Sequence, residues 1–427
     1  MRILVISSTP WSEQNSFGST FSNFFQGMEK VEIANVFCKS GLPQNNLVSR
    51  YFQITFMDLI RNLKNSSHPS GKELQCQAAS TLTQNVQKRY DTARKLRWQI
   101  FFWANDFIWS VGRWRSEALN AFLEDFQPDV IFQPLYYSKH LNQIALYCKE
   151  KTGAPMVGYV SDDIYTLRQF SLSPLYWIDR LWVRGYVKKG IDACEWIYTI
   201  SRIQKEEYEK IFKKEFKILT KGADFSGQPS VKEKLSDPVR FVYTGNIGGG
   251  RWKSLALLAT AIQKKNHAGQ RAILDIYTPT PLTNRMKKKL CIAGASRVLG
   301  SVSSDRIPAI QRDADVLVHA EGMGLKSRLE VHQSFSTKLV DYFRAGRCVF
   351  AIGTPDMASI DHLCRYKAAI VATSAAEVEA NLERVLSDRK LYCDTVSSAW
   401  ECGKRCHNKQ ELQKMLYEDL DRLRKDT

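Results

Sequence analysis

Residues 333–346, which read "QSFSTKLVDYFRAG", place a basic and an acidic side chain where one ligand could use both. Ser336 or Thr337 can cap the helix that this segment predicts. Lys338 in the first turn opposes the helix dipole, at a cost of roughly 0.3–1 kcal/mol unless an anion compensates. Asp341, one turn on, can accept hydrogen bonds from sugar hydroxyls. We therefore expect a helix start that binds a phosphate and a sugar; the alternative is an ordinary Lys–Asp surface pair.

A glycine-rich loop, "YTGNIGGGRWKSL" (243–255), separates a predicted strand from a predicted helix. The strand ends at Gly245, and Arg251 and Lys253 stand at the helix start. Glycines let a backbone approach a phosphate, and a helix N-terminus with a basic residue favours an anion. The alternative is a tight turn that needs glycine only for its dihedral angles. The loop lacks the endings of the P-loop and of the dinucleotide fingerprint.

Two adjacent aspartates, Asp162 and Asp163, end the predicted strand "PMVGYVSDD". Either carboxylate could orient or deprotonate an acceptor hydroxyl. The alternative is that one of them caps a helix beginning near Ile164. His140 and His319 are isolated in the sequence, and we expect both to be structural.

Short apolar strands alternate with longer helical segments on both sides of a linker at 222–238, which is rich in Gly, Pro, Ser and charge. This alternation predicts an α/β fold with two Rossmann-like, doubly wound parallel-sheet domains facing across a cleft. Ligands of such sheets bind at the carboxyl ends of the strands. The predicted boundaries are 1–225 and 238–400 for the two domains and 401–427 for a C-terminal helix, with packing back on the N-terminal domain as one option.

The segment before residue 126 is harder to interpret. Residues 40–90 are polar except for an apolar patch at 51–60, and we expect helix and loop there. Residues 94–126 show helical spacing of large apolar side chains. The aromatic residues from Trp98 to Trp114 favour packed helices, because Phe101, Ile108 and Val111 recur at near-helical spacing. The alternative is a membrane-facing or lipid-acceptor surface.

The net charge of +17 admits three kinds of partner: nucleic acid, an anionic membrane or a phosphorylated small molecule. The basic residues are dispersed and no nucleic-acid motif occurs, so we expect no nucleic-acid partner. A basic surface is compatible with peripheral membrane contact. The chain of 427 residues is long enough for two domains, and no apolar run reaches the roughly 18–20 residues that span a bilayer.

Ten cysteines are scattered along the chain without any C-x-x-C pair. Cys402 and Cys406 have no matching pair elsewhere in the sequence, so we expect no metal site. The segment "MRILVISSTP" is too short an apolar run for a signal peptide. Scattered cysteines without a secretion signal predict a cytoplasmic protein, with the inner face of the membrane as an option.

The second half resembles the C-terminal domain of family 4-like glycosyltransferases of the GT-B class, which have two Rossmann-like domains. That family has two glutamates separated by seven residues, with a Phe-Gly pair just inside the first. Here Gln333, Phe335, Ser336 and Asp341 keep the spacing while both acids are changed. The element "RDADVLVHAEG" (312–322) is similar to the family strand that leads to the donor site.

The family's loop of a glycine followed by a basic residue is matched by Gly245 and Arg251. Its arginine directly after the glycine is replaced by Asn246, and Lys338 is the candidate substitute. In the first half, "ISSTPWSEQNSFGS" resembles the first-strand loop whose glycine, here Gly18, lies under the donor phosphates. Residues 40–125 match nothing specific.

The resemblance implies sugar transfer from a nucleotide sugar, UDP-linked rather than GDP-linked, to a hydroxyl of a glycan, a lipid-linked molecule or a small molecule. It also implies retention of configuration and no metal or other cofactor. Arg251 and Lys338 would stabilise the leaving diphosphate, and Asp162 or Asp163 would act on the acceptor. The implied donor-binding residues are Gly18, Gly245, Asn246, Glu321, Phe335, Ser336, Thr337 and Asp341.

Two alternatives remain. A nucleotide-sugar epimerase of the same architecture would need a cluster of acids and histidines around the sugar, which the sequence does not reveal. A catalytically inactive, transferase-like binding subunit is favoured by Gln333 and Asn246, because both replace charged family residues.

Overall fold

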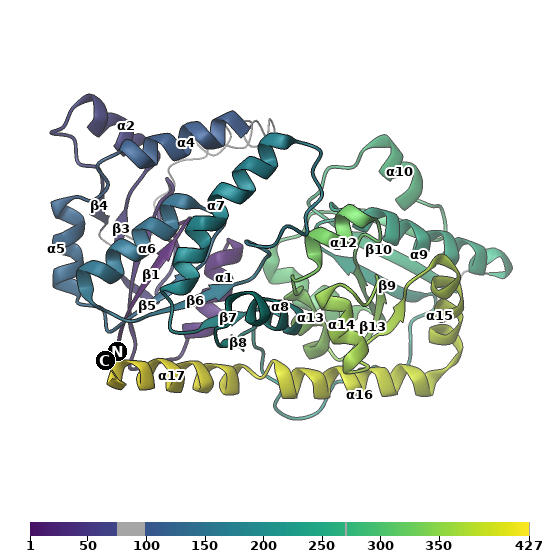
Figure 1. Cartoon of the computed structure of the whole chain (residues 1–427). Helices are drawn as coiled ribbons and strands as arrows, with labels where there is room; N and C mark the ends of the chain where they lie inside the picture. The colour runs from purple at the N-terminus through teal and green to yellow at the C-terminus, as the bar shows by residue number, and fades with distance from the viewer. Residues whose placement is uncertain (75–98, 270, 427) are drawn as a thin grey trace.

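Two predominantly parallel β-sheets, each covered by helices on both faces, lie side by side (Figure 1). This computed structural model describes residues 1–74, 99–269 and 271–426. The strands of the first sheet lie within residues 2–218 and those of the second within residues 239–372. The predicted fold class, two doubly wound α/β domains, is confirmed.

The first sheet has eight strands in the order β4-β3-β2-β1-β5-β6-β7-β8. Neighbouring strands are parallel except for β3 and β4. The strand order reverses between β1 and β5, and such a switch point is where open α/β sheets bind ligands. The strands are β1 (Arg2–Ser7), β2 (Glu32–Phe37), β3 (Val48–Gln53), β4 (Lys72–Leu74), β5 (Val130–Pro134), β6 (Met156–Val160), β7 (Ile197–Thr199) and β8 (Phe216–Ile218).

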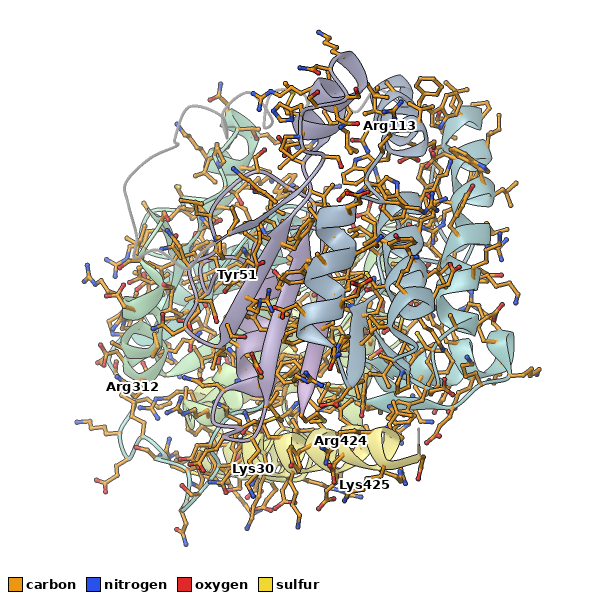
Figure 2. The ribbon with its side chains drawn as sticks, turned by 90° about the vertical axis from the view of Figure 1, so that its left-hand side faces the viewer. Lys30, Tyr51, Arg113, Arg312, Arg424 and Lys425 are labelled. Carbon is orange, nitrogen blue, oxygen red and sulfur yellow. The ribbon has the colours of Figure 1, made fainter. Side chains whose placement is uncertain are left out.

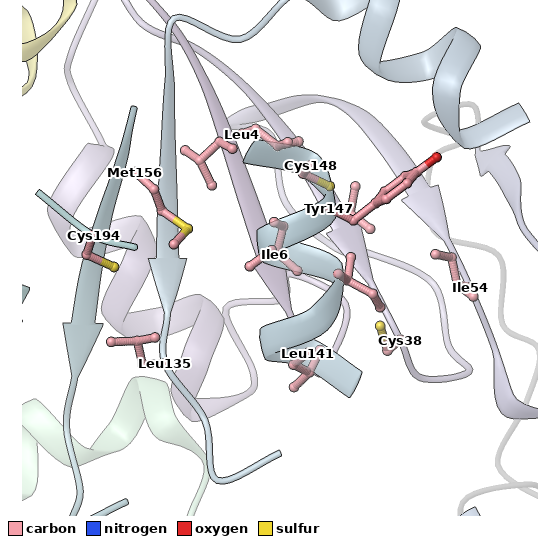
Figure 3. Packing of buried hydrophobic residues seen from close by; sticks show 14 of the residues in the cluster. Leu4, Ile6, Cys38, Ile54, Leu135, Leu141, Tyr147, Cys148, Met156 and Cys194 are labelled. Carbon is pink, nitrogen blue, oxygen red and sulfur yellow. The ribbon is translucent and has the colours of Figure 1, made fainter. Parts of the chain in front are cut away.

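Both faces of this sheet are buried, as a parallel sheet requires. Leu4 and Ile6 point to one face, where they pack with Leu141 and Cys148 of the crossover helix α6 (Figure 3). Ile3 and Val5 point to the other face. Among the described residues of this domain the helices are α1 (Ser16–Phe25), α2 (Phe56–Lys64), α4 (Gln99–Val111), α5 (Glu117–Phe126), α6 (Lys139–Thr152), α7 (Pro174–Asp192) and α8 (Arg202–Phe212).

The second sheet has six parallel strands in the order β11-β10-β9-β12-β13-β14, with its switch point between β9 and β12. The strands are β9 (Val239–Thr244), β10 (Ala272–Tyr277), β11 (Ser296–Gly300), β12 (Val316–Ala320), β13 (Cys348–Ile352) and β14 (Ile370–Ala372). The α-helices are α9 (Arg251–Lys265), α10 (Asn284–Leu290), α11 (Ile307–Asp313), α12 (Leu325–Val331), α13 (Lys338–Arg344), α14 (Ala358–Arg365), α15 (Ala375–Ser387) and α16 (Arg389–Cys406).

The last helix returns to the first domain. Helix α16 lies under the second sheet, and α17 (Lys409–Asp426) continues under the first, bringing the two termini close together (Figure 1). Leu416, Leu420 and Leu423 of α17 pack with Ile3 and Val5 on one face of the first sheet. Figure 2 shows α17 across the lower ends of these strands, near Lys30. The crossing therefore begins at about residue 408, later than the predicted boundary at 401.

Two local expectations were wrong. The apolar patch at 51–60 contributes to a strand, β3, as well as to helix α2. No helix begins near Ile164, and the next helix starts at Pro174. The segment 94–126, where packed helices were expected, forms α4 and α5 in its described part, because Ser116 caps a new helix by accepting a hydrogen bond from the Leu119 amide.

The aromatic segment is divided between core and surface. Trp109 and Trp114 are buried in the core of the first domain, in accord with the packing interpretation. Phe107 and Val111, which lie on α4 together with Trp109, are exposed. The near-helical spacing that included Val111 therefore did not identify the buried face of this helix. Trp98 and the side chain of Phe101 lie outside what the structure describes. A search of the described helices finds none with the length and hydropathy of a membrane span.

Candidate active site

A cleft of about 1620 Å³ lies between the domains. On the first domain it is lined at the carboxyl ends of β1, β5 and β6, including Ser8, Tyr136 and Asp162. On the second domain it is lined by residues 335–338. The topology thus brings residues of both domains to one solvent-accessible space, where the alternation of strands and helices predicted a ligand.

Lys338 brings a positive charge to this cleft. Its ammonium group donates to the Thr244 carbonyl at 3.2 Å and lies 4.7 Å from the centre of the Tyr243 ring. Among the described residues, no carboxylate forms an ion pair with it within 4 Å. Burial lowers the pKa of Lys338 to about 8; the Arg251 charge also lowers it, and Glu321 opposes both. Burying an ammonium group costs free energy unless an opposite charge compensates it, so this site favours binding of an anion beside Lys338.

Gly245 makes room for that lysine. It has φ +130°, and a Cβ there would lie 2.9 Å from Lys338 Nζ. Its own N–H donates to the Tyr277 carbonyl at 2.9 Å, so the amide is used within the sheet. Any other residue would be strained and would displace the lysine, which gives this glycine a role that the sequence did not reveal.

Arg251, Glu321 and His319 form a group beside Lys338, in which Glu321 and His319 are buried and Arg251 is partly exposed. Gly245 follows β9 and Glu321 follows β12, which are neighbours at the switch point. Arg251 Nε donates to Glu321 Oε2 at 2.9 Å, and His319 Nε2 lies 3.5 Å from Glu321 Oε1. Burial raises the pKa of Glu321. Glu321 is 3% exposed, so it positions Arg251 from behind.

Asn246 shapes the glycine loop. Its side-chain oxygen accepts from the Gly248 amide at 2.6 Å and from the Thr280 hydroxyl at 3.1 Å. Gly250 adopts the left-handed conformation with φ +83°, and a Cβ there would lie 2.8 Å from Ser327 Oγ. The loop is therefore rigid and packs against residues 322–327.

Gln333, at the position of the first family acid, faces the other domain. Its Nε2 donates to Glu207 Oε2 at 2.6 Å, and its backbone carbonyl accepts from Ser201 Oγ at 2.6 Å. His332 Nε2 lies 3.0 Å from Glu207 Oε1, and Arg168 pairs with the same oxygen. Burial alone would raise the pKa of Glu207, but hydrogen bonds from His332 and Gln333, with the charges of His332 and Arg168, lower it to about 2.

The two aspartates have different surroundings. Asp163 Oδ1 accepts from the amides of Tyr165 and Thr166 at 3.0 and 2.8 Å, and lies 3.4 Å from Arg180 NH2. Its carboxylate is therefore engaged in holding a turn, which argues against the expected catalytic role. Asp162 is exposed to the cleft and accepts from Ser334 Oγ of the second domain at 2.8 Å.

Three other expectations differ from the structure. Neither Ser336 nor Thr337 caps α13 through its side chain. Asp341 pairs with Lys221 of the first domain, at 2.7 and 2.9 Å, instead of with Lys338, and it does not line the cleft. The amide of Gly18 donates to Asn15 Oδ1 at 2.7 Å, and a Cβ at Gly18 would lie 2.1 Å from the Ser12 carbonyl oxygen. Gly18 is thus required for packing, and its amide is already used.

Asp106 is a cleft residue that the sequence did not reveal. It lines the cleft from the first domain, and His140 Nδ1 lies 4.0 Å from its Oδ1. Burial, with a smaller effect of the Asp179 charge, raises its pKa to about 6. His140 stacks on Trp109 with ring centres 4.3 Å apart. A carboxyl group with a raised pKa in a cleft is a candidate general base, but only the fold brings these residues together.

The fold of this chain is similar to that of several solved protein structures. No family model and no curated protein sequence matches the chain. Among solved structures, sucrose-phosphate synthase from Thermosynechococcus elongatus is 11% identical, with a TM-score of 0.63 and the full length of both chains covered. HepE from Anabaena, in complex with UDP, is 12% identical, with a TM-score of 0.62 over 99% of this chain and 100% of that one.

The GtfA/B complex is similar over a smaller part. One of its chains is 13% identical with a TM-score of 0.53, and the match covers 72% of this chain and 60% of that one. These neighbours are GT-B glycosyltransferases, and identities this low establish the fold alone. The chain has the two-domain GT-B fold that the resemblance of residues 333–346 implied.

Proposed function

We propose that this protein is a glycosyltransferase that moves a sugar from a nucleotide-sugar donor to an acceptor hydroxyl in the interdomain cleft. The observation that carries this proposal is the position of Lys338. Its ammonium group lines the cleft of a GT-B fold, and no carboxylate among the described residues forms an ion pair with it. The leaving diphosphate gains negative charge in the transition state, and preorganised cations stabilise that charge more than they stabilise the bound donor.

The proposal assigns a role to each of four residues of the site. Lys338 would contact the diphosphate, with Arg251 behind it held by Glu321. On the acceptor side, Asp106 can take a proton once it is ionised above pH about 6. Asp162, at the junction of the two domains, would orient the acceptor. Retention of configuration, and protein cations in the place of a metal, belong to this proposal as what the resemblance implies.

UDP is the proposed nucleotide. HepE, which shares the fold, was solved with UDP and also with UDP-glucose. The alternative epimerase would need acids and histidines facing the sugar. The structure pairs His319 with Glu321 and His332 with Glu207, but none of these four residues lines the cleft. The pair that does line it, Asp106 and His140, supplies a single histidine, whose ring is stacked on Trp109. Transfer is therefore the better-supported chemistry.

Calorimetric titration with UDP tests the donor site through its proton balance. An anion beside Lys338 raises the pKa of that lysine from about 8, so binding at pH 8.5 should take up protons from the buffer. The apparent binding enthalpy should then depend on the ionisation enthalpy of the buffer at pH 8.5, and much less at pH 6.5, where Lys338 is already protonated. No binding of UDP, GDP or their sugars would refute the proposal. Binding without hydrolysis or transfer would favour the inactive subunit.

Helix α7 supports a membrane-associated acceptor. Leu175, Ile178, Leu181 and Trp182 are 41–57% exposed on this helix, and Leu175 also lines the cleft. Lys188 and Lys189 follow on the same helix. Exposed apolar side chains next to basic ones are typical of interfacial helices. We propose that α7 contacts an anionic membrane and admits a lipid-linked acceptor from it.

Vesicle flotation tests this contact. The protein should float with vesicles that contain anionic lipid and much less with neutral ones, because basic side chains each contribute about 1 kcal/mol near an anionic surface. Replacing Ile178, Leu181 and Trp182 together by serine should abolish flotation. Leu42→Ser, which removes a 54% exposed leucine from a loop elsewhere, is the control. Equal flotation of the triple variant would exclude α7 as the contact.

A further inference from the structure

Three metal-ligating side chains meet where α16 ends and the chain crosses to α17. Cys402 lies on α16, His407 directly follows that helix, and His362 lies on the neighbouring helix α14. The ligand atoms of the three residues all lie within 4.8 Å of one another. His362 Nε2 is 3.1 Å from Cys402 Sγ and 3.2 Å from His407 Nε2.

The distances suit a tetrahedral zinc ion. Zinc binds nitrogen at about 2.0–2.1 Å and thiolate sulfur at about 2.3 Å, which places ligand atoms roughly 3.3–3.6 Å apart. The two separations from His362 Nε2 are within about half an ångström of these values. The third pair, Cys402 Sγ and the His407 ligand nitrogen, lies within 4.8 Å, so one ion can reach all three atoms if these two side chains approach each other by up to about 1 Å.

Hydrogen bonding alone satisfies this arrangement poorly. A neutral imidazole nitrogen carries either one proton or one lone pair, so His362 Nε2 can make one good hydrogen bond in the ring plane. Two polar atoms nevertheless face it at hydrogen-bond distance. A shared cation would use the lone pairs of both rings and a sulfur lone pair at once. Cys402 and His407 are 2% and 1% exposed, so water cannot readily take the place of that partner.

The surroundings orient the ligands. His407 Nδ1 lies 2.8 Å from Thr220 Oγ1, which fixes the ring so that Nε2 faces the other two ligands. Metal-binding histidines characteristically engage their second nitrogen in this way. Phe335 stacks on the His407 ring with centres 5.3 Å apart, and Tyr366 packs on His362 at 4.8 Å. These rings exclude solvent from the cluster.

We propose that His362, Cys402 and His407 bind a zinc ion, with Cys406 as the fourth ligand. Cys406 lies one helical turn after Cys402, on the same helix face, and its thiol contacts that of Cys402. Its sulfur does not belong to the group whose ligand atoms all lie within 4.8 Å of one another, so its side chain must turn toward the other three ligands to complete the site. A thiolate and imidazole set with tetrahedral geometry favours Zn²⁺ over Mg²⁺ or Ca²⁺. The sequence did not predict this site, because His362 lies 40 residues before Cys402 on another helix.

The zinc would join the two domains at the point where the chain passes from α16 to α17. The backbone of His407 accepts from the Ala223 amide at 2.8 Å, and Lys409 donates to the Ala223 carbonyl at 3.0 Å. Phe335, which covers His407, belongs to the loop that carries Lys338 into the cleft. An ion at this position would hold α14, the crossing and the donor loop together.

Metal analysis of the untagged full-length chain tests the site. Purified under reducing conditions, the wild type should bind one equivalent of Zn²⁺, and its melting temperature should rise with added Zn²⁺ and fall with a chelator. The Co²⁺-substituted protein should show tetrahedral visible bands and a thiolate-to-metal charge-transfer band. Cys402→Ser and His362→Gln should lose the ion. Cys364→Ser, which changes an exposed cysteine on α14, should keep it.

Each outcome decides the proposal. Less than about a tenth of an equivalent of tightly bound zinc after titration of the wild type would overturn it. So would a Co²⁺ spectrum without a thiolate band, which needs no variant and therefore holds even if Cys402→Ser does not fold. Loss of metal in Cys406→Ser to the same extent as in Cys402→Ser supports the fourth ligand, and full retention assigns that position to water and overturns the Cys406 assignment.

Discussion

Lys338→Met lowers the rate of donor hydrolysis or sugar transfer by about 100- to 1000-fold, the effect of removing one preorganised charge contact to a transition state. The methionine keeps most of the length of the side chain and removes only the charge. Saturation kinetics with a UDP-sugar should show the loss mainly in kcat, because negative charge on the diphosphate develops as the sugar bond breaks.

The same variant should be at least as stable as the wild type. In the folded protein, burial lowers the pKa of Lys338 to about 8 from the ordinary lysine value of 10.5. A lysine with a lowered pKa destabilises the fold below pH 8, by on the order of 3 kcal/mol before solvent screening is allowed for, and this cost disappears as pH rises toward 10.5. Denaturant unfolding at pH 7 should therefore separate loss of activity from loss of structure.

Lys253→Met is the matched control. Lys253 lies in the first turn of α9, is exposed and does not line the cleft. It should retain nearly full activity. If Lys338→Met retained wild-type kcat, the diphosphate would bind elsewhere and the assignment of this lysine would be wrong.

Gln333→Glu should weaken the contact between the domains. The change restores the acid of the related family, but it places a second carboxylate where the Gln333 amide now donates to Glu207 at 2.6 Å. Two ionised carboxylates at that distance repel, and the lost buried hydrogen bond adds to the cost, for a total of about 2–4 kcal/mol. The loss of stability should grow from pH 5 to pH 8 as both carboxyl groups ionise. Thermal unfolding across that pH range measures this loss.

A second substitution provides the control. Glu207→Gln in the Gln333→Glu background reverses donor and acceptor, and it should recover much of the stability at pH 8. If Gln333→Glu were as stable as the wild type at that pH, the two side chains would not be in contact. A gain in transfer rate for Gln333→Glu would show instead that this side chain reaches the sugar, as the first family acid does.

In the wild type, the contribution of Glu207 and His332 to stability also depends on pH. The pKa of His332 is raised, chiefly by its hydrogen bond to Glu207, so its contribution is complete below the unfolded value near 6.5 and is lost as pH rises through the folded value. The lowered pKa of Glu207, about 2, gives a contribution that is present above the unfolded value near 4.5 and is lost as pH falls through about 2. The cluster is therefore strongest between about pH 4.5 and 6.5.

Local patterns were enough to predict the architecture. Buried strands such as β1 and β9 are short apolar runs that end in polar or glycine residues, and their alternation with helices fixes a parallel sheet. The same rule places ligands at the strand ends, where Asp162 lies, whereas Lys338 was predicted from its position at a helix start; both line the cleft, and their roles stay predictions. The edge strand β4 has only three residues and no apolar pattern, and it was missed.

The site could not be predicted in full, because several of its residues pair with partners that lie far away in the sequence. Asp341 was expected to bind sugar hydroxyls or to pair with Lys338, one turn earlier, but its partner is Lys221, 120 residues earlier in the sequence. Gln333 was read as a lost acid, whereas its partner Glu207 lies 126 residues away. Close approaches, such as Ser12 against Gly18 or Lys338 over Gly245, likewise depend on tertiary packing that no spacing rule encodes.

The return of α17 to the first sheet has a consequence for how the protein is made. A ribosome releases the eight strands of that sheet well before residues 409–426, so Ile3 and Val5 lack part of their cover during most of synthesis. The first domain therefore cannot complete its core in the order in which it is translated. Its final packing waits for α17, which follows the second domain in the chain.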